Sequence, residues 1–248
     1  MPILLFPSTR YICKIGIFTY MATINITTFI FDLDGTLLDT LEDLTSSVNY
    51  ALQTNGYQTH SMDEVRMMVG NGVGKLIQRA LPQDTSEGKK TEVLSSFRNH
   101  YLKHSEDTTK PYDGIIEILQ KLKERGKKVA VVSNKFDKAT KRLCMKYFEG
   151  LVDIALGEDE ANGIHKKPAP DMVFKAMKEL GSAPNECVYI GDSDVDIDTA
   201  SNAGIICISV LWGFRSMEFL CNHGAKLFAK TPSEIIDIAD LDVSKSRK

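Results

Sequence analysis

Cysteine is scarce in this sequence of 248 residues, and no two cysteines form a Cys-x-x-Cys pair. The five cysteines are widely spaced and odd in number, so the sequence predicts neither a disulfide framework nor a structural zinc site. Chains without such a framework are typical of a reducing compartment, and we therefore expect a cytoplasmic location.

An excess of charge of one sign is also missing. Lys and Arg number 30 against 33 Asp and Glu, which gives a formal net charge of −3 at pH 7. So small a charge offers no general attraction for nucleic acid or an anionic membrane surface. The apolar residues at the N-terminus are interrupted by Pro7, Arg10 and Lys14, so no membrane span fits there. We expect neither nucleic acid nor membrane as a partner, and the sequence leaves the oligomeric state open.

The N-terminal segment lacks the features of a secretory signal. No basic stretch precedes its apolar residues, and no Ala-x-Ala-like cleavage site follows them. Met21 stands a few residues before the first recognisable strand. We interpret residues 1–24 as an N-terminal extension and hypothesise that Met21 is the natural start, with residues 1–20 upstream of it.

The first informative stretch of the sequence is residues 28–36. An apolar, aromatic and β-branched run, residues 28–31, predicts a buried parallel strand, and it ends at Asp32, Asp34, Gly35 and Thr36. Ligands of open α/β sheets bind at the carboxyl ends of strands, and alternation along a strand makes both aspartates project the same way. A metal ion or a shared proton would relieve their repulsion. The alternative, two solvated aspartates at a helix start, is disfavoured by the Asp-x-Asp-Gly-Thr pattern directly after an apolar strand.

Residues 40–111 carry helical patterns and no clear strand. Thr40-x-x-Asp43 predicts a capping box at the first helix, and three more helices follow, with a glycine-rich turn at residues 70–72 between the second and third. A segment of this length with so much helical pattern is a compact insert rather than a long loop.

Strands and helices alternate from residue 112 onward, which is typical of a doubly wound parallel sheet. We therefore predict an α/β fold in which residues 25–39 and 112–248 form a Rossmann-like core and residues 40–111 form an inserted small α-helical cap domain. The strands expected in the second part of the core are residues 128–132, 151–155, 187–190, 205–210 and a short one near 225–229.

Further polar signals stand at strand ends and in loops of this region. Ser133 and Asn134 lie between a strand and a helix start, where backbone N–H groups and the helix dipole favour an anion such as a phosphate oxygen. Lys167 precedes Pro168, which locks the local backbone, and a fixed ammonium can neutralise a phosphoryl group. Taken singly, a helix cap and a solvated loop explain these residues equally well.

Four alternating aspartates at residues 192–198 imitate the start of a calcium-binding loop. Ile197 occupies the place where that loop needs Gly, and Ala203 the place where it needs Glu, so calcium is disfavoured. Mg²⁺ typically takes one or two carboxylates plus substrate phosphate, which fits Asp32 together with Asp192.

In this order, the features resemble the signature of the haloacid dehalogenase (HAD) superfamily of phosphatases. The helical insert lies where the family carries its small cap. The four motifs of the family are matched by Asp32 with Asp34, by Ser133, by Lys167, and by Asp192 with Asp196. Longer stretches are similar to the phosphoglycolate phosphatase-like branch, among them Val69-Gly70-Asn71-Gly72, Ser133-Asn134-Lys135 and Trp212-Gly213-Phe214-Arg215.

The resemblance implies a Mg²⁺-dependent phosphomonoester hydrolase that works through an aspartyl-phosphate intermediate. Asp32 is then the nucleophile, Asp34 the general acid and base, and Lys167 a further catalytic group. The metal ligands are expected to be Asp32, Asp192 and the backbone carbonyl of Asp34. Asp196 is expected to pair with Lys167 and orient it, with Ser193 beside it. The residues expected to contact substrate are Ser133, Asn134, Lys167, Gly35, Thr36 and, from the cap, Asn71.

The expected substrate is a small phosphorylated metabolite, 2-phosphoglycolate first, with pyrophosphate, a nucleotide or a sugar phosphate as alternatives for the same chemistry. Dehalogenases of the superfamily lack the aspartate found here as Asp34, and the mutase branch carries a histidine in the first cap helix, near the place where Leu44 stands. A non-catalytic phospho-receiver or binding protein is a distant alternative. Catalytic hydrolysis of a small phosphate ester would distinguish a phosphatase from either of them.

Overall fold

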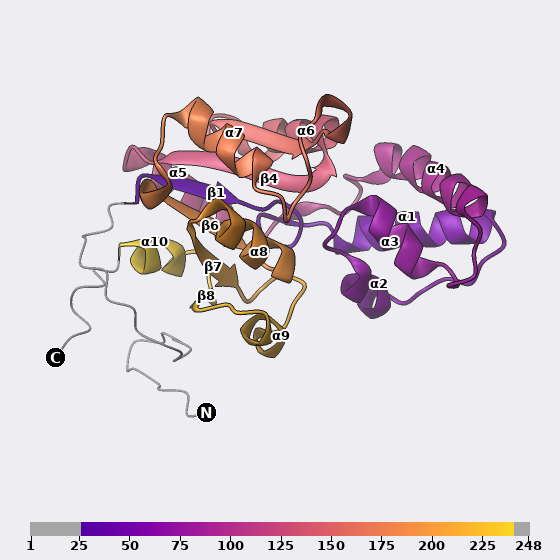
Figure 1. Ribbon diagram of the computed structural model, residues 1–248. Helices are drawn as coiled ribbons and strands as arrows, with labels where there is room; N and C mark the ends of the chain where they lie inside the picture. The colour runs from indigo at the N-terminus through magenta and orange to yellow at the C-terminus, as the bar shows by residue number, and fades with distance from the viewer. Residues whose placement is uncertain (1–25, 241–248) are drawn as a thin grey trace.

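The computed structural model describes residues 26–240, so the extension at residues 1–24 and the hypothesis about Met21 lie outside the described residues. A parallel sheet with helices on both faces forms one part, and four helices stand beyond one edge of this core (Figure 1). Among the described residues, no helix is both long enough and apolar enough to cross a membrane.

Six parallel strands form the sheet in the order β5-β4-β1-β6-β7-β8. The first strand therefore lies in the middle, and its residues Phe29, Ile30 and Phe31 are completely buried. A continuous apolar run is what a parallel strand covered on both faces requires, and the predicted doubly wound sheet is confirmed. The strands are β1 (Thr28–Phe31), β4 (Lys128–Phe136), β5 (Ile154–Glu158), β6 (Cys187–Gly191), β7 (Ile206–Val210) and β8 (Leu227–Ala229).

Alternate residues of the central strands supply the two faces of the core. Phe29 and Phe31 pack under α5 (Ile115–Glu124), α6 (Asp137–Phe148) and α10 (Glu234–Ala239). Ile30 packs on the other side, under α7 (Asp171–Leu180), and α8 (Asp194–Ala203) adds Ala200 and Ala203 to the same cluster. The short α9 (Met217–Asn222) buries Leu220 in a cluster of its own near β8. Two 3₁₀ turns, Glu160–Asn162 and Pro184–Glu186, complete the core.

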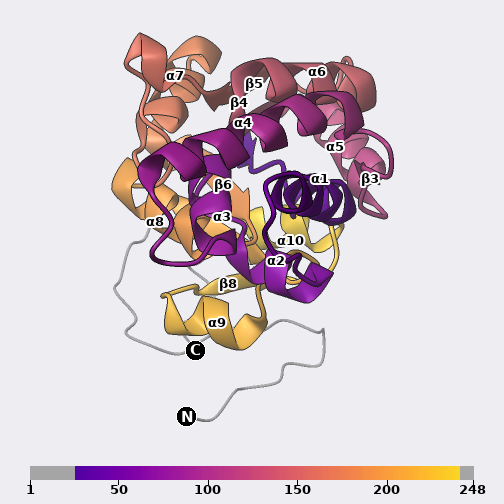
Figure 2. The same ribbon diagram turned by 90° about the vertical axis from the view of Figure 1, so that its right-hand side faces the viewer.

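The four remaining helices enclose a separate apolar cluster, to which Leu52, Ile77 and Phe97 contribute side chains at most 1% exposed. These helices are α1 (Leu41–Thr54), α2 (Met62–Met68), α3 (Val73–Ala80) and α4 (Glu87–His104). Seen from their side, they lie in front of the core, beyond the carboxyl ends of the strands (Figure 2). The chain enters and leaves them through β2 (Leu38–Asp39) and β3 (Lys110–Pro111), which pair as an antiparallel ribbon.

Two strand boundaries differ from the expectation. The strand expected at residues 151–155 begins only at Ile154, because Leu151 and Val152 donate their N–H groups to the carbonyl of Phe148 and finish the turn after α6. The strand expected at residues 128–132 continues to Phe136, with an irregular register after Val132.

The expected capping box between Thr40 and Asp43 is wrong. Thr40 is the N-cap of α1 but makes no side-chain cap bond, and its hydroxyl is buried with no hydrogen-bond partner in the described part of the chain. Asp43, only 2% exposed, accepts hydrogen bonds from the N–H and hydroxyl groups of both Thr108 and Thr109. The carboxylate thus ties the start of α1 to the segment that leads into β3.

This contact predicts a large stability effect. Asp43→Ala is expected to lower the free energy of unfolding by about 2–4 kcal/mol, because it leaves buried donors without an acceptor. Urea denaturation measures the change. The exposed neighbour Glu42 is the control, since Glu42→Ala should change stability by no more than about 0.5 kcal/mol. A loss at Asp43 no larger than that of the control would contradict the interpretation.

Candidate active site

Asp32 and Asp34 leave the end of β1 toward two different ammonium groups. The Asp32 carboxylate lies 2.8 Å from Lys167 Nζ, and that of Asp34 lies 2.8 Å from Lys135 Nζ. Both aspartates line the same pocket, as expected from their position at the strand end. Gly35 makes the turn that follows possible because its φ of +86° lies in the left-handed region.

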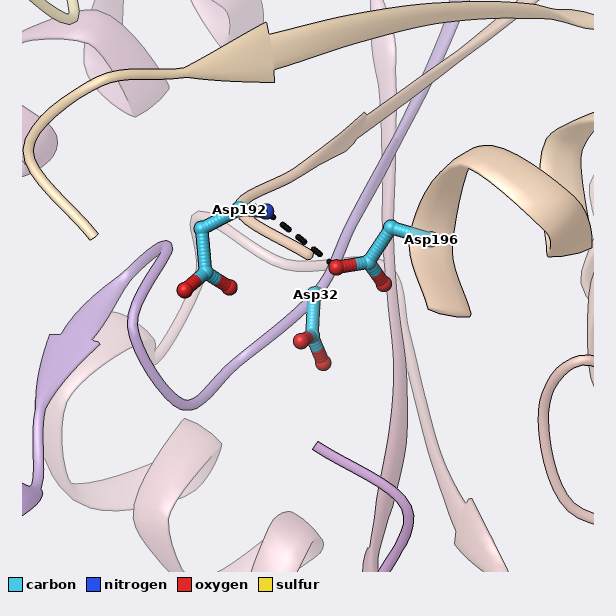
Figure 3. Close-up of side chains that lie close together, drawn as sticks. All are labelled: Asp32, Asp192 and Asp196. Atoms are coloured by element: carbon cyan, nitrogen blue, oxygen red, sulfur yellow. Dashed lines mark hydrogen bonds between the residues drawn. The ribbon is translucent and has the colours of Figure 1, made fainter. Parts of the chain in front are cut away.

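Three carboxylates from two strand ends and a helix converge beside this turn. Asp32 follows β1, Asp192 follows β6 and Asp196 lies in the first turn of α8, and one oxygen of each lies within 4.8 Å of the others (Figure 3). Burial raises the pKa of Asp32 well above its usual range, and Asp196 and Asp192 add to the rise while Lys167 opposes it. Burial likewise raises the pKa of Asp192 to about 7, again with a contribution from Asp196. So much buried like charge favours binding of a cation.

The oxygens of Asp196 are already occupied. Oδ1 accepts hydrogen bonds from Lys167 Nζ at 2.8 Å and from the Tyr189 hydroxyl at 3.2 Å. Oδ2 accepts from the N–H groups of Asp192 and Ser193 and from the Ser193 hydroxyl. Asp196 therefore organises the cluster, and the two other carboxylates of the cluster are the better candidates for a cation. The expected pair between Lys167 and Asp196 is present.

Lys167 is held from both its backbone and its side chain. Its ammonium lies within 3.1 Å of Asp32, Asp196 and the Tyr189 hydroxyl, and the residue is 3% exposed. Burial alone would lower the pKa of Lys167, but Asp196 and Asp32 outweigh it and keep the pKa well above its usual range. Asn134 accepts a hydrogen bond from the Lys167 N–H at 2.7 Å and donates one to its carbonyl at 3.0 Å.

The pocket itself lies between the core and the cap. Ser133, Asn134 and Lys167 line it from the core, and Leu44 and Val73 are among the apolar side chains that line it from the cap. Of the residues expected to contact substrate, Gly35, Thr36 and Asn71 are not among those that line it. Asn71 accepts a hydrogen bond from Arg79 and lines a neighbouring hollow instead.

Gly35 and Thr36 have a different part in the site. The Thr36 hydroxyl donates to Asp192 Oδ1 at 3.3 Å. A Cβ atom at Gly35 would lie 2.5 Å from Asp192 Oδ2, and one at Gly213 would lie 2.5 Å from the carbonyl of Gly35. Trp212 donates its indole N–H to the carbonyl of Thr36 at 2.9 Å. The turn after β1 and the loop after β7 therefore close around the Asp192 carboxylate.

Three buried side chains near the pocket carry no role in the sequence-based expectations. Lys135 pairs with Asp34 and contacts the hydroxyl of Tyr101, which belongs to the cap helix α4. Arg215, in the loop after β7, donates to the carbonyls of Arg66, Met67 and Val69 at the end of α2. For two of them the sequence contained a signal, since Lys135 and Arg215 lie in stretches similar to the family. That signal did not indicate which residues they contact.

The fold and this site define a hydrolase of the haloacid dehalogenase type. The profile of the haloacid dehalogenase-like hydrolase family matches residues 29–210, and the chain belongs to that family. Phosphoglycolate phosphatase of Aquifex aeolicus is 35% identical over 212 residues, which cover 85% of this chain and 95% of that protein. Phosphoglycolate phosphatase of Vibrio parahaemolyticus is 34% identical over 218 residues, which cover 84% of this chain and 90% of that protein. A solved structure from Lactobacillus delbrueckii subsp. bulgaricus, 37% identical, has a TM-score of 0.81 and covers 85% of this chain and 96% of its own.

The crowded loop after β7 leads to a test of the carboxylate cluster. Gly213→Ala places a methyl group against Asp192 and is expected to weaken binding of a divalent cation by about tenfold or more. Titration calorimetry with MgCl₂ measures the change. Gly88→Ala is the control, because a Cβ there meets no atom within 4 Å. Equal Mg²⁺ affinity of the folded Gly213 and Gly88 variants would contradict this account of the cluster.

Proposed function

We propose that this protein is a Mg²⁺-dependent phosphomonoester hydrolase whose substrate is 2-phosphoglycolate. The observation that carries the proposal is the convergence of Asp32 and Asp192, at the ends of adjacent strands, with Lys167 from the loop before α7, beneath a cap of helices. The relatives named phosphoglycolate phosphatase, at 34–35% identity, support the choice of substrate. Pyrophosphate, a nucleotide and a sugar phosphate are the alternatives for the same site.

Asp32 is proposed as the nucleophile. A carboxylate oxygen of Asp32 attacks phosphorus, the bond from phosphorus to the leaving oxygen breaks, and an aspartyl-phosphate forms on Asp32. The N–H of Leu33 donates to Asp32 Oδ1 at 2.7 Å and holds the carboxylate in place. Water then attacks the phosphorus of the intermediate and releases inorganic phosphate.

Asp34 is proposed as the general acid and base. As an acid it gives its proton to the leaving oxygen, and as a base it takes a proton from the attacking water. Assistance of this kind contributes roughly 10²–10⁴-fold to a rate. Ser133 and Lys167 are proposed to bind the phosphoryl oxygens, because both line the pocket beside Asp32. Asn134 supports Lys167 through two hydrogen bonds to its backbone.

The cluster at the strand ends fits a magnesium ion, because Mg²⁺ prefers oxygen ligands and the buried carboxylates lack sufficient positive charge nearby. Asp32, Asp192 and the backbone carbonyl of Asp34 would hold it. When bound, the ion supplies positive charge that offsets repulsion between an anionic nucleophile and an anionic ester. The role of Asp196 is to keep Lys167 and the turn after β6 in position.

Residues 40–111 are proposed to act as the cap that covers the bound substrate, with residues 25–39 and 112–248 as the catalytic core. The pocket between them is lined mainly by apolar groups on the cap side, which exclude bulk water during phosphoryl transfer. Cys144, Cys187 and Cys207 are free, which fits the cytoplasmic location that we propose.

The nucleophile assignment is tested by Asp32→Asn, which keeps the shape of the side chain and removes its charge. Phosphate release from 2-phosphoglycolate in MgCl₂ is expected to fall by about 10⁴-fold or more. Asp84→Asn, at an exposed position outside the pocket, should keep full activity. Activity retained in Asp32→Asn would contradict the assignment of Asp32 as the nucleophile. A panel that adds pyrophosphate, a nucleotide and a sugar phosphate to 2-phosphoglycolate decides between the substrates.

The raised pKa of Asp192, about 7 against an ordinary value of 3.8, predicts how the effect of Mg²⁺ depends on pH. Without a cation, the folded protein keeps this proton and the unfolded chain releases it, so the contribution of Asp192 to stability falls as pH rises from about 4 to 7. A cation at the site needs the ionised carboxylate and therefore stabilises the fold more at pH 8 than at pH 5.5. We expect a gain in Tm from 5 mM MgCl₂ that is larger at pH 8 by about 4 °C.

Scanning calorimetry at the two pH values measures this difference. Asp192→Asn is expected to lose most of the Tm gain at pH 8. An equal gain at both pH values in the wild-type protein would contradict a cation site at Asp192.

A further inference from the structure

The ammonium of Lys135 joins the core, the cap and the proposed general acid. Lys135 Nζ lies 2.8 Å from Asp34 Oδ1 and 3.1 Å from Oδ2, and it donates a hydrogen bond of 2.6 Å to the Tyr101 hydroxyl. Lys135 is 4% exposed and Tyr101 2% exposed. Both oxygens of the Asp34 carboxylate therefore face one buried cation, and this cation is fixed in turn by a side chain from the cap.

The fold places these three groups with little freedom. Lys135 lies in the last part of β4, within the irregular stretch between Val132 and Phe136, and its N–H donates to the Ser133 hydroxyl at 3.2 Å. Tyr101 lies in α4, which passes over the end of β4 (Figure 2), and its ring stacks on Phe97 at 5.3 Å. The Lys135 ammonium also lies over the Tyr101 ring, 4.7 Å from its centre.

The surroundings keep Lys135 charged and the Tyr101 hydroxyl neutral. Burial alone would lower the pKa of Lys135, but Asp34 and Tyr101 outweigh it and raise the pKa above its usual range. Burial raises the pKa of Tyr101 to about 12, so its hydroxyl stays neutral. Among the carboxylates of the described residues, only that of Asp34 forms an ion pair with Lys135.

We propose that Lys135 and Tyr101 are positioning residues for Asp34. Lys135 fixes the orientation of the carboxyl group through both of its oxygens, and Tyr101 fixes Lys135 from the cap, so Asp34 is oriented for proton transfer only when α4 lies against the core. When Asp34 gives its proton to the leaving oxygen, the carboxylate that remains faces an ammonium already in place. The inference rests on the proposed function, in which Asp34 is the general acid.

The alternative is that the three groups only hold the cap to the core. Substrates with different leaving groups distinguish this structural role from the positioning role. The alkoxide that leaves from 2-phosphoglycolate needs a proton, whereas the carboxylate that leaves from acetyl phosphate does not. For both substrates kcat/KM reports the first phosphoryl transfer to Asp32. A positioning role for the acid lowers kcat/KM for 2-phosphoglycolate selectively, and a purely structural role lowers both values by the same factor.

The variants are Tyr101→Phe, which keeps the ring and loses the hydroxyl, and Lys135→Met, which keeps the length of the side chain and loses the charge. The first control is Tyr147→Phe, because the Tyr147 hydroxyl donates to the carbonyl of Thr109 at 2.7 Å, outside the pocket. The second is Lys128→Met, because Lys128 Nζ donates to the carbonyl of Leu180, also outside the pocket.

We expect Tyr101→Phe to lower kcat/KM for 2-phosphoglycolate about five- to tenfold, and Lys135→Met about 100-fold. For acetyl phosphate the loss should stay below about twofold in Tyr101→Phe, and both controls should leave the ratio of the two values unchanged. Equal losses on the two substrates, or no loss on either, would overturn the inference. Absence of Mg²⁺-dependent hydrolysis in the wild-type protein, or full activity of Asp32→Asn, would instead overturn the proposed function.

Discussion

The ammonium of Lys167 is the group on which the rest of the site depends. Without it, Asp32, Asp192 and Asp196 would be three buried carboxylates with one oxygen of each within 4.8 Å of the others. One ion pair to Asp32 and another to Asp196 offset part of this repulsion. Removing one partner from such a buried pair usually costs several kcal/mol, because the other charge is left unpaired.

This constraint explains why so many backbone groups converge on the same place. Asp196 accepts two N–H groups of the turn after β6, and Asp192 accepts the N–H of Phe214 at 2.7 Å. Asn134 fixes the backbone of Lys167 from β4. Because parallel strands bring their carboxyl ends to one edge, segments that are about 160 residues apart in the sequence can share a single buried charge network.

Much of the sheet and the charged centre of the site could be predicted from the sequence, because both depend on residues that are close together in the sequence. The apolar run of β1 is followed at once by Asp32, and the strand expected at residues 187–190 is present as β6, Cys187–Gly191. The roles that the resemblance implies for Asp32, Asp34 and Lys167 stay predictions, since the geometry brings these residues together without testing their chemistry.

Other features depend on partners that are distant in the sequence. Asp43 has the spacing of a capping residue, yet its carboxylate binds Thr108, 65 residues away, because the ends of the helical segment meet at the ribbon of β2 and β3. Gly35 and Thr36 looked like substrate contacts, but the loop after β7 packs on them and turns them toward Asp192. Burial also supplied partners for Lys135 that no local pattern specified.

The paired strands that lead into and out of the cap also limit how the two parts of the protein can move. Two independent single-chain linkers would allow the cap to twist, slide and swing, whereas β2 and β3 are bonded to each other and the Asp43 contacts join α1 to the second crossing. The ribbon and the start of α1 are therefore joined to each other, and Gly114, with a φ of +85°, lies on the core side of the second crossing. We expect such an attachment to favour a hinge-like rotation of the cap over twisting or sliding, so that the same face of α4 meets the carboxyl ends of the strands each time the cap closes.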